Sequence, residues 1–336
     1  MPRRTLDVRS VRLRLKSPFR ISGYVFEATD AIVATITEAG RRGRGEAAGV
    51  YYTGDDLAHM LAEAEKARNA IEAGADREEL LAILPPGGAR NALDCALWEL
   101  EAAQAEMPAW QLAGIEAPRP VVTTFTVGAE PAADAVAATF AFPDPRAIKI
   151  KLSGDAEADL ERVEAIRAAR PDVWLGVDAN QGYKGSDLPW LVEALASQNV
   201  SLLEQPVRRG AEAELDGFES VIPIAADESI LSLAELPSAV GRFDIVNIKL
   251  DKCGGLTEAL AIAAEARRLG LGVMVGNMVG SSLAMAPAFI LAQLCDFVDL
   301  DGPTFIAEDV RPAVSYEDGH IWCGEGVWGG SGRLAA

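Results

Sequence analysis

The sequence predicts an α/β protein in which a parallel β/α barrel of the TIM type follows an N-terminal α+β domain. From Val121 onward, short apolar strands alternate with helical stretches, and eight strands can be counted. Eight such units in succession predict a parallel sheet that closes into a barrel. The preceding part instead combines strands of alternating polarity with a block of helices, and 336 residues are enough for both units.

The N-terminal domain is predicted to span residues 1–117. The stretches LDVRSVRLRL and DAIVATITEAG alternate apolar and polar residues, which is typical of antiparallel strands with one solvated face. Three helical patterns follow, at residues 55–72, 77–84 and 89–105, and PPGG separates the last two. The stretch EAPRP closes this part of the chain.

The barrel is predicted to span residues 118–310. After Gly302 the chain has little helical pattern, so we expect the segment 311–336 to pack back on the N-terminal domain and complete it. The eight predicted strands are VVTTFTVG, AIKIKL, VWLGVDAN, VSLLEQP, IPIAADES, DIVNIKL, LGVMVGN and FVDLDG.

Composition limits the function classes. The formal net charge of −19 and the pI near 4.6 argue against nucleic acid or an anionic membrane as partner. The sequence contains no run of about 20 apolar residues, so we expect no membrane span. The four cysteines form no CxxC pair, which favours buried thiols in a cytoplasmic protein. A small-molecule substrate and a homo-oligomer are both compatible with this composition.

Acidic residues close three consecutive predicted strands. Asp178, Glu204 and Asp227 would meet at the mouth of the barrel, where the C-terminal ends of the strands form active sites. Three carboxylates placed together repel one another unless a cation binds, and a hard all-oxygen ligand set suits Mg²⁺ better than zinc. The alternative is that these acids only cap the helices that follow.

Lysines flank the acidic strands. Lys149 and Lys151 share one face of their strand because alternate side chains point the same way, and Lys249 ends the strand after Asp227. Lys151 and Lys249 would then lie on opposite sides of the metal. Lys149 and the cation could lower the pKa of Lys151, as a general base requires. A surface position for Lys149 and Lys151 is the alternative.

This charge pattern indicates chemistry at a carbon next to a carboxylate. Removing an α-proton there creates an enediolate with two negative oxygens, which a metal and an ammonium group can stabilise. Two lysines on opposite faces can remove a proton from one side and return one to the other, which is racemisation or epimerisation. One active lysine would instead suit elimination or cycloisomerisation.

The motifs KIK, DAN, EQP, ADES and NIKLDKCGG occur in an order that resembles the muconate-cycloisomerase subgroup of the enolase superfamily, and within it the dipeptide epimerases. The resemblance implies a modified (β/α)₇β barrel with an α+β capping domain. It also implies Asp178, Glu204 and Asp227 as Mg²⁺ ligands and Lys151 and Lys249 as the acid/base pair. Lys149 would assist at the substrate carboxylate.

Three further positions follow from the same resemblance. DLDGP is similar to the D-x-D of dipeptide epimerases, so Asp299 and Asp301, which share a face, would receive the substrate's α-ammonium group. Thr126 occupies the place of a site threonine. The stretch PFRISGYVFEATD resembles the loop that covers the substrate, with Tyr24 where side-chain preference is set. A tyrosine there leaves glutamate or a hydrophobic second residue open.

The predicted function is Mg²⁺-dependent dipeptide epimerisation, in which the α-carbon of the C-terminal residue is inverted by 1,1-proton transfer through an enediolate. The alternatives are an N-acylamino acid racemase, an o-succinylbenzoate synthase and a muconate-type cycloisomerase. Substrates of these enzymes lack a free α-ammonium group, so the Asp299–Asp301 pair argues against them.

Overall fold

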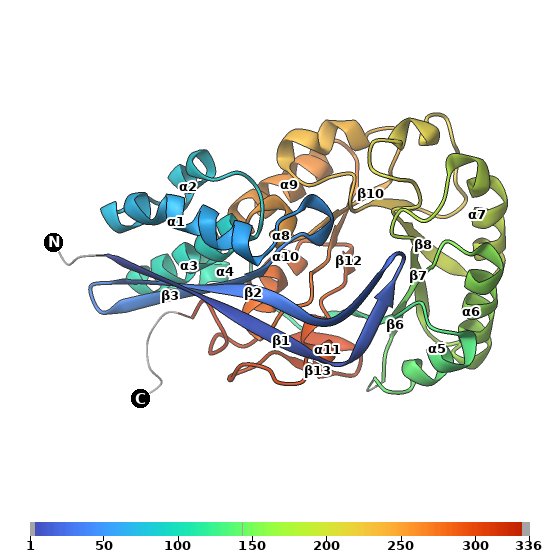
Figure 1. Cartoon of the computed structure of the whole chain (residues 1–336), viewed down its shortest axis with the longest axis horizontal. Coiled ribbons are helices and arrows are strands. Elements are labelled where there is room, and N and C mark those ends of the chain that lie inside the picture. The colour runs from blue at the N-terminus through green and yellow to red at the C-terminus, as the bar shows by residue number, and fades with distance from the viewer. Residues whose placement is uncertain (1–3, 143, 331–336) are drawn as a thin grey trace.

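An antiparallel sheet begins the chain. The computed structural model describes residues 4–142 and 144–330. Strands β1 (Thr5–Ile21), β2 (Tyr24–Glu38) and β3 (Arg41–Ala48) pair in that order, and β1 and β2 form a long hairpin that crosses Figure 1 toward the barrel. Residues 18–30, predicted as a loop, are the tip of this hairpin. Phe19 pairs with Phe26 there, after a shift in register that follows Arg14.

Three helices cover this sheet: α1 (Leu57–Ala73), α2 (Arg77–Ile83) and α3 (Gly88–Ala105). Their bounds agree closely with the helices predicted from the sequence. The sequence pattern did not indicate β3, because glycine is a poor strand former. The structure explains the glycines, since a Cβ atom at Gly43 would lie 2.0 Å from the carbonyl oxygen of Ala96, and one at Gly45 2.1 Å from that of Ala92. Strand β3 therefore needs glycine to lie directly on α3.

The second unit is an eight-stranded parallel barrel, which confirms the predicted fold class. Its strands occur in sequence order around the barrel, and helices cover the outside (Figure 1). The strands are β5 (Thr124–Val127), β6 (Ala147–Lys151), β7 (Trp174–Asp178), β8 (Val200–Glu204), β9 (Ile224–Ala226), β10 (Ile245–Ile248), β11 (Gly272–Val275) and β12 (Phe297–Val298). The helices are α5 (Ala132–Thr139), α6 (Ala156–Ala169), α7 (Leu188–Ser197), α9 (Leu256–Arg268) and α10 (Ser282–Ala292).

Short elements fill the connections between these strands and helices. In the part of the chain that the structure describes, only 3₁₀ helices follow β8 and β9, namely η3 (Glu212–Leu215) and η4 (Leu233–Ala239). The remaining short elements are η1 (Tyr51–Thr53), α4 (Ala109–Leu112), η2 (Gly185–Asp187), α8 (Leu250–Cys253) and α11 (Gly302–Phe305). Within the described ranges, no helix is long and apolar enough to cross a membrane.

The last strand meets the first through side chains. The hydroxyl of Thr123 accepts a hydrogen bond from the backbone nitrogen of Leu300 at 2.9 Å, and the carboxylate of Asp301 accepts one from the backbone nitrogen of Thr126 at 2.6 Å. These bonds link the region of β12 to the region of β5. Residues near the start and near the end of the barrel sequence therefore face the same interior.

The C-terminal segment connects both units. Strands β13 (Ser315–Glu317) and β14 (His320–Trp322) pair with β4 (Val121–Val122) in a separate three-stranded sheet. Farther on, the indole nitrogen of Trp328 donates to the carbonyl oxygen of Arg44 in β3 at 2.7 Å. Residues 331–336 of the predicted segment lie outside the described residues, and the domain boundary at residue 117 stays a prediction.

Candidate active site

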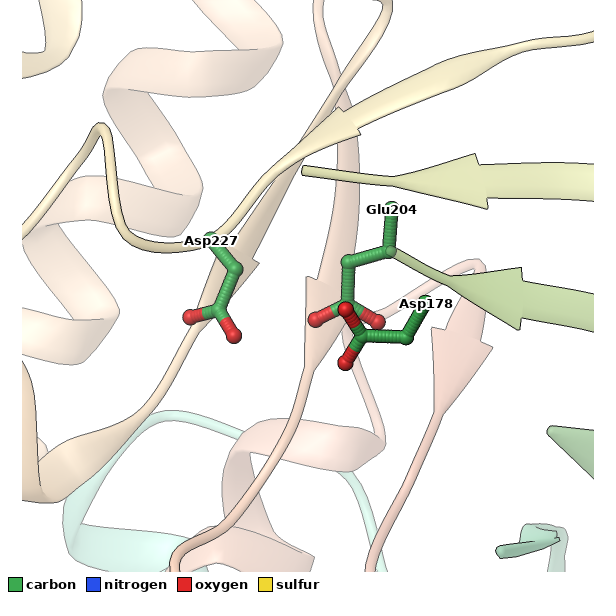
Figure 2. Close-up of side chains that lie close together, drawn as sticks. All are labelled: Asp178, Glu204 and Asp227. Carbon is green, nitrogen blue, oxygen red and sulfur yellow. The ribbon is translucent and has the colours of Figure 1, made fainter. Parts of the chain in front are cut away.

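Three carboxylates meet at the C-terminal ends of β7, β8 and β9. Asp178 and Glu204 are the last residues of their strands and are cross-strand neighbours, and Asp227 directly follows β9. All three are buried, and one oxygen from each lies within 4.8 Å of the others. Figure 2 shows the three side chains converging from successive strands. The group contains no histidine or cysteine, so it offers the hard oxygen ligands that suit Mg²⁺.

The alternation of side chains along each strand explains why these acids point inward. Leu202 in β8 and Ala225 in β9 belong to a small apolar cluster with residues of the neighbouring strands, and Glu204 and Asp227 each lie two residues farther along the chain. Residues two apart share a face, so the acids continue the inward-facing rows above this apolar layer. The residues between them, such as Leu203 and Ala226, belong to the main core cluster.

The three lysines predicted from the sequence all make ion pairs with these acids. The ammonium group of Lys151 lies 2.5 Å from Asp178, and that of Lys249 lies 2.6 Å from Asp227. Lys149 pairs with Asp299 and lies 3.4 Å from Glu204. Since β6 and β10 flank the three acidic strands, Lys151 and Lys249 approach the carboxylates from opposite sides, as the sequence predicted.

The charges at this end of the barrel do not balance. Burial would lower the pKa of Lys249, yet the carboxylates around it hold that pKa well above its usual value. Burial and the charge of Asp178 raise the pKa of Glu204 to about 7. With all of them ionised, the six buried carboxylates and four buried ammonium groups of the site would leave two excess negative charges, which a divalent cation would neutralise. They are Asp178, Glu204, Asp227, Glu228, Asp299 and Asp301 with Lys149, Lys151, Lys249 and Lys252.

The two aspartates after β12 face the start of the barrel. Asp299 accepts hydrogen bonds from the hydroxyl groups of Thr124 and Thr126, the latter at 3.4 Å. Burial would raise the pKa of Asp299, but its ion pair with Lys149 lowers it. Burial and the charge of Asp299 raise the pKa of Asp301 to about 7. Asp299 is therefore the better placed of the two to carry a negative charge before a ligand arrives.

A cavity of about 350 Å³ lies between the barrel mouth and the N-terminal domain. Lys151 and Lys249 line its floor, together with Asp227, Glu228 and Asn180. Apolar and aromatic residues of the N-terminal part of the chain also line the cavity, and we call them the roof: Phe19, Ile21, Phe26, Tyr51 and Tyr52. Met278 and Val279, which follow β11, line it as well. Tyr24 is not one of the lining residues. It is 46% exposed, and its ring lies 4.7 Å from that of Tyr51.

Models of two protein families match the chain in sequence order. The mandelate racemase / muconate lactonizing enzyme N-terminal domain matches residues 3–114, and the enolase C-terminal domain-like family matches residues 129–327. The chain belongs to the enolase superfamily. This agrees with the resemblance found in the KIK, DAN, EQP and ADES motifs.

Within the superfamily, the similar proteins include epimerases and a racemase. The chain is 39% identical to the L-Ala-D/L-Glu epimerase of Escherichia coli, over 95% of this chain and 99% of that protein. It is 41% identical to an N-acetyl-D-glutamate racemase from a Pseudoalteromonas species, over 75% and 80%. The dipeptide epimerase from Enterococcus faecalis V583, solved with Mg and L-Leu-L-Tyr, is 30% identical over 99% of both chains, with a TM-score of 0.89.

The sequence interpretation of this enolase superfamily member assigned no role to three polar residues at the site. Lys252 donates to Asp227 Oδ1 at 2.7 Å and to the carbonyl oxygen of Asn247 at 2.8 Å. Asn247 donates to Glu204 at 2.7 Å, and Glu228 accepts from Asn180 at 3.2 Å. A signal existed for Asn247, because it interrupts an apolar strand two residues before Lys249 and so shares its face.

Proposed function

We propose that this protein is a Mg²⁺-dependent dipeptide epimerase that inverts the α-carbon of the C-terminal residue. The observation that carries the proposal is the pair of buried lysines, Lys151 and Lys249, on opposite sides of the three carboxylates. Two such groups can act on both faces of one α-carbon, which is what 1,1-proton transfer requires. Relatives named as dipeptide epimerases at 30–39% identity support the same reaction.

In this proposal Asp178, Glu204 and Asp227 hold the metal. Mg²⁺ held there would supply positive charge beside the substrate carboxylate, on which negative charge builds up as the α-proton leaves. Lys149, buried between Glu204 and Asp299, adds an ammonium group on the same side. One of Lys151 and Lys249 takes the α-proton as the neutral amine, and the other returns a proton to the opposite face from its ammonium form.

The remaining predicted residues would position the substrate's first residue. We assign the α-ammonium group to Asp299 and Asp301, which offer two carboxylates beside one another at the end of β12. Thr126 fixes this pair, since its backbone nitrogen donates to Asp301 and its hydroxyl to Asp299. Tyr24 would cover the cavity indirectly, through its ring contact with Tyr51.

We also propose different roles for the barrel and for the N-terminal domain. Residues 118–310 would carry the reaction and residues 1–117, completed by 311–330, would cap it. The structure holds all four cysteines as free thiols, which supports a reducing compartment such as the cytoplasm.

An N-acylamino acid racemase is the second candidate, because one relative is named an N-acetyl-D-glutamate racemase. Both substrates carry an amide on the nitrogen of the reacting residue, but only the dipeptide has an ammonium group on the carbon next to the amide carbonyl. An uncharged acyl group gains nothing from Asp299, whose carboxylate would then serve only to pair with Lys149. This favours the dipeptide. An o-succinylbenzoate synthase or a muconate-type cycloisomerase would leave one of the two lysines without a proton to move.

Deuterium exchange tests the proposal. Purified protein with Mg²⁺ is incubated in D₂O with pooled L,L-dipeptides and, separately, with N-acetyl-L-amino acids, and mass spectra are recorded. We expect dipeptides to gain one mass unit and D-configuration at the second residue. Exchange confined to the N-acetyl amino acids would favour the second candidate, and no exchange in either pool would refute both.

A further inference from the structure

We propose that the side chain of the epimerised residue is a large apolar or aromatic group that binds under the β1–β2 hairpin, with Phe26 as its main contact. This inference rests on the proposed function and adds to it the substrate class. It differs from what the E. coli relative's name describes, which is a glutamate in the second position.

The direction of the side chain follows from the reaction. When the α-proton leaves, the α-carbon becomes planar, and its carboxylate, nitrogen and β-carbon lie in one plane between the two lysines. The carboxylate points to the acids at the ends of β7 to β9, and the nitrogen leads to the aspartates after β12. The third substituent, the β-carbon with its side chain, then points out of the barrel through its mouth. The cavity that adjoins Lys151 and Lys249 there continues to the roof.

The roof offers aromatic surface at that point. Phe19 and Phe26 are paired residues on neighbouring strands, and the ring of Phe26 lies 5.3 Å from that of Tyr51. The ring of Tyr51 in turn lies 5.0 Å from that of Tyr52. The rings of Phe26, Tyr51 and Tyr52 therefore form one connected wall. Burying an apolar side chain against it is favourable by about 25 cal/mol for each Å² removed from water.

The charges around the cavity disfavour an acidic side chain. Among the described residues that line it, Lys151 and Lys249 are the cations, and both are paired with the predicted metal ligands. The other charged lining residues are acids: Asp30, Asp55, Asp56, Asp227 and Glu228. A glutamate side chain would therefore lose water without meeting a free cation.

A cationic side chain would gain little from three of the lining acids, because these already have partners. Asp55 accepts from the backbone nitrogen of Gly88 at 2.8 Å and lies 2.7 Å from the His59 ring. Asp30 pairs with Arg12 at 3.3 Å. Asp56 caps helix α1 by accepting from the backbone nitrogen of His59.

The first experiment compares kcat/KM for L-Ala-L-Phe, L-Ala-L-Leu, L-Ala-L-Glu and L-Ala-L-Lys in the deuterium exchange assay. We expect the phenylalanine and leucine dipeptides to exceed the other two by roughly 100-fold, since a buried charge without a partner is costly. Exchange led by L-Ala-L-Glu or L-Ala-L-Lys would overturn the side-chain assignment alone. Exchange with none of the four, nor with other dipeptides, would instead overturn the proposed function.

The second experiment tests whether a substitution at Phe26 changes the preference for the side chain of the epimerised residue. Phe26→Arg places a cation on the roof and should raise the ratio of kcat/KM for L-Ala-L-Glu over L-Ala-L-Phe by roughly 50-fold. Val25→Arg is the matched control, because Val25 is the next residue, is 52% exposed and points to the opposite face of the hairpin. That variant should leave the ratio within about threefold of the parent. Equal ratios in the two variants would refute the role of Phe26.

Discussion

The floor and the roof of the cavity are built in opposite ways. On the floor, charged side chains at the ends of parallel strands are buried in ion pairs, as Lys151 is with Asp178 and Lys249 with Asp227. On the roof, rings from a hairpin and from the segment after β3 contact one another without such pairs. Under the proposed function, this difference means that the floor would determine which bond reacts, whereas the roof would determine which side chain fits.

The two regions are also held differently. Floor residues lie on neighbouring strands whose backbone hydrogen bonds set their spacing. The hairpin reaches the barrel at a few points. Its tip accepts a hydrogen bond at the Arg20 carbonyl from the backbone nitrogen of Ala129 at 3.1 Å, and farther back the Arg14 carbonyl accepts from Ala307 at 2.8 Å. Substitutions on the roof should therefore change specificity with less loss of stability than those on the floor.

The largest effect is expected for Asp227→Asn, which removes a predicted metal ligand and leaves Lys249 and Lys252 without their carboxylate. Epimerisation should fall by at least ~10³-fold, because the developing charge on the substrate loses its stabilisation. Exchange kinetics and Mg²⁺ titration by calorimetry measure this. Activity within tenfold of the parent would show that the metal is not held at this position.

Lys252→Met tests whether a residue outside the cavity supports the floor. Lys252 donates to Asp227 and to the carbonyl oxygen of Asn247 but does not line the cavity. Losing one partner of a buried ion pair should lower the free energy of unfolding by about 3 kcal/mol. Urea unfolding measures this change. Lys184→Met is the control, because Lys184 is exposed, and it should have little effect. Equal stability of the two variants would mean that Lys252 does not support the site.

Asp299→Asn tests recognition of the first residue. It should lower kcat/KM for L-Ala-L-Phe by about 100-fold, because the substrate ammonium loses a charged acceptor. Parallel assays with N-acetyl-L-Ala-L-Phe supply the control, since this compound lacks the ammonium group and should lose far less. Equal losses on both compounds would argue that Asp299 acts through Lys149 alone.

The smallest predicted effect is the pH dependence of stabilisation by Mg²⁺. Because the pKa of Glu204 is raised to about 7, the folded metal-free protein binds more protons than the unfolded chain between about pH 4 and 7. Metal-free stability should fall as pH rises through this window. A cation must displace that proton at pH 5.5 but not at pH 8, so the stabilisation by Mg²⁺, followed as the shift in Tm, should be larger at pH 8 by about 2 kcal/mol of unfolding free energy. An equal gain at both pH values would contradict this linkage.

Much of the floor could be predicted because a polar residue that follows an apolar run marks the end of a strand in the sequence. Asp178, Glu204 and Lys249 each close an apolar run, and the parallel order of strands then brings them together. Lys252 could not be predicted this way. It lies on the short helix α8, and only the fold brings its ammonium group back to the carboxylate of Asp227.

The roof was harder to predict than the floor. Residues 18–30 lack the regular alternation of the earlier part of β1, and a register shift after Arg14 displaces every later pairing. The position assigned to Tyr24 by resemblance lies near the hairpin tip, and Phe26, two residues along the same face, lines the cavity. A small error in aligning a hairpin tip is enough to exchange such neighbours.

The central claim is that Lys151 and Lys249 serve opposite faces of one α-carbon, and single-lysine variants test it most directly. Lys151→Ala and Lys249→Ala are each incubated in D₂O with Mg²⁺ and, separately, with the L,L and L,D epimers of one substrate. The account predicts that neither variant epimerises, that each exchanges the α-proton of one epimer only, and that the two variants differ in which epimer this is. Exchange of both epimers by either variant would contradict it.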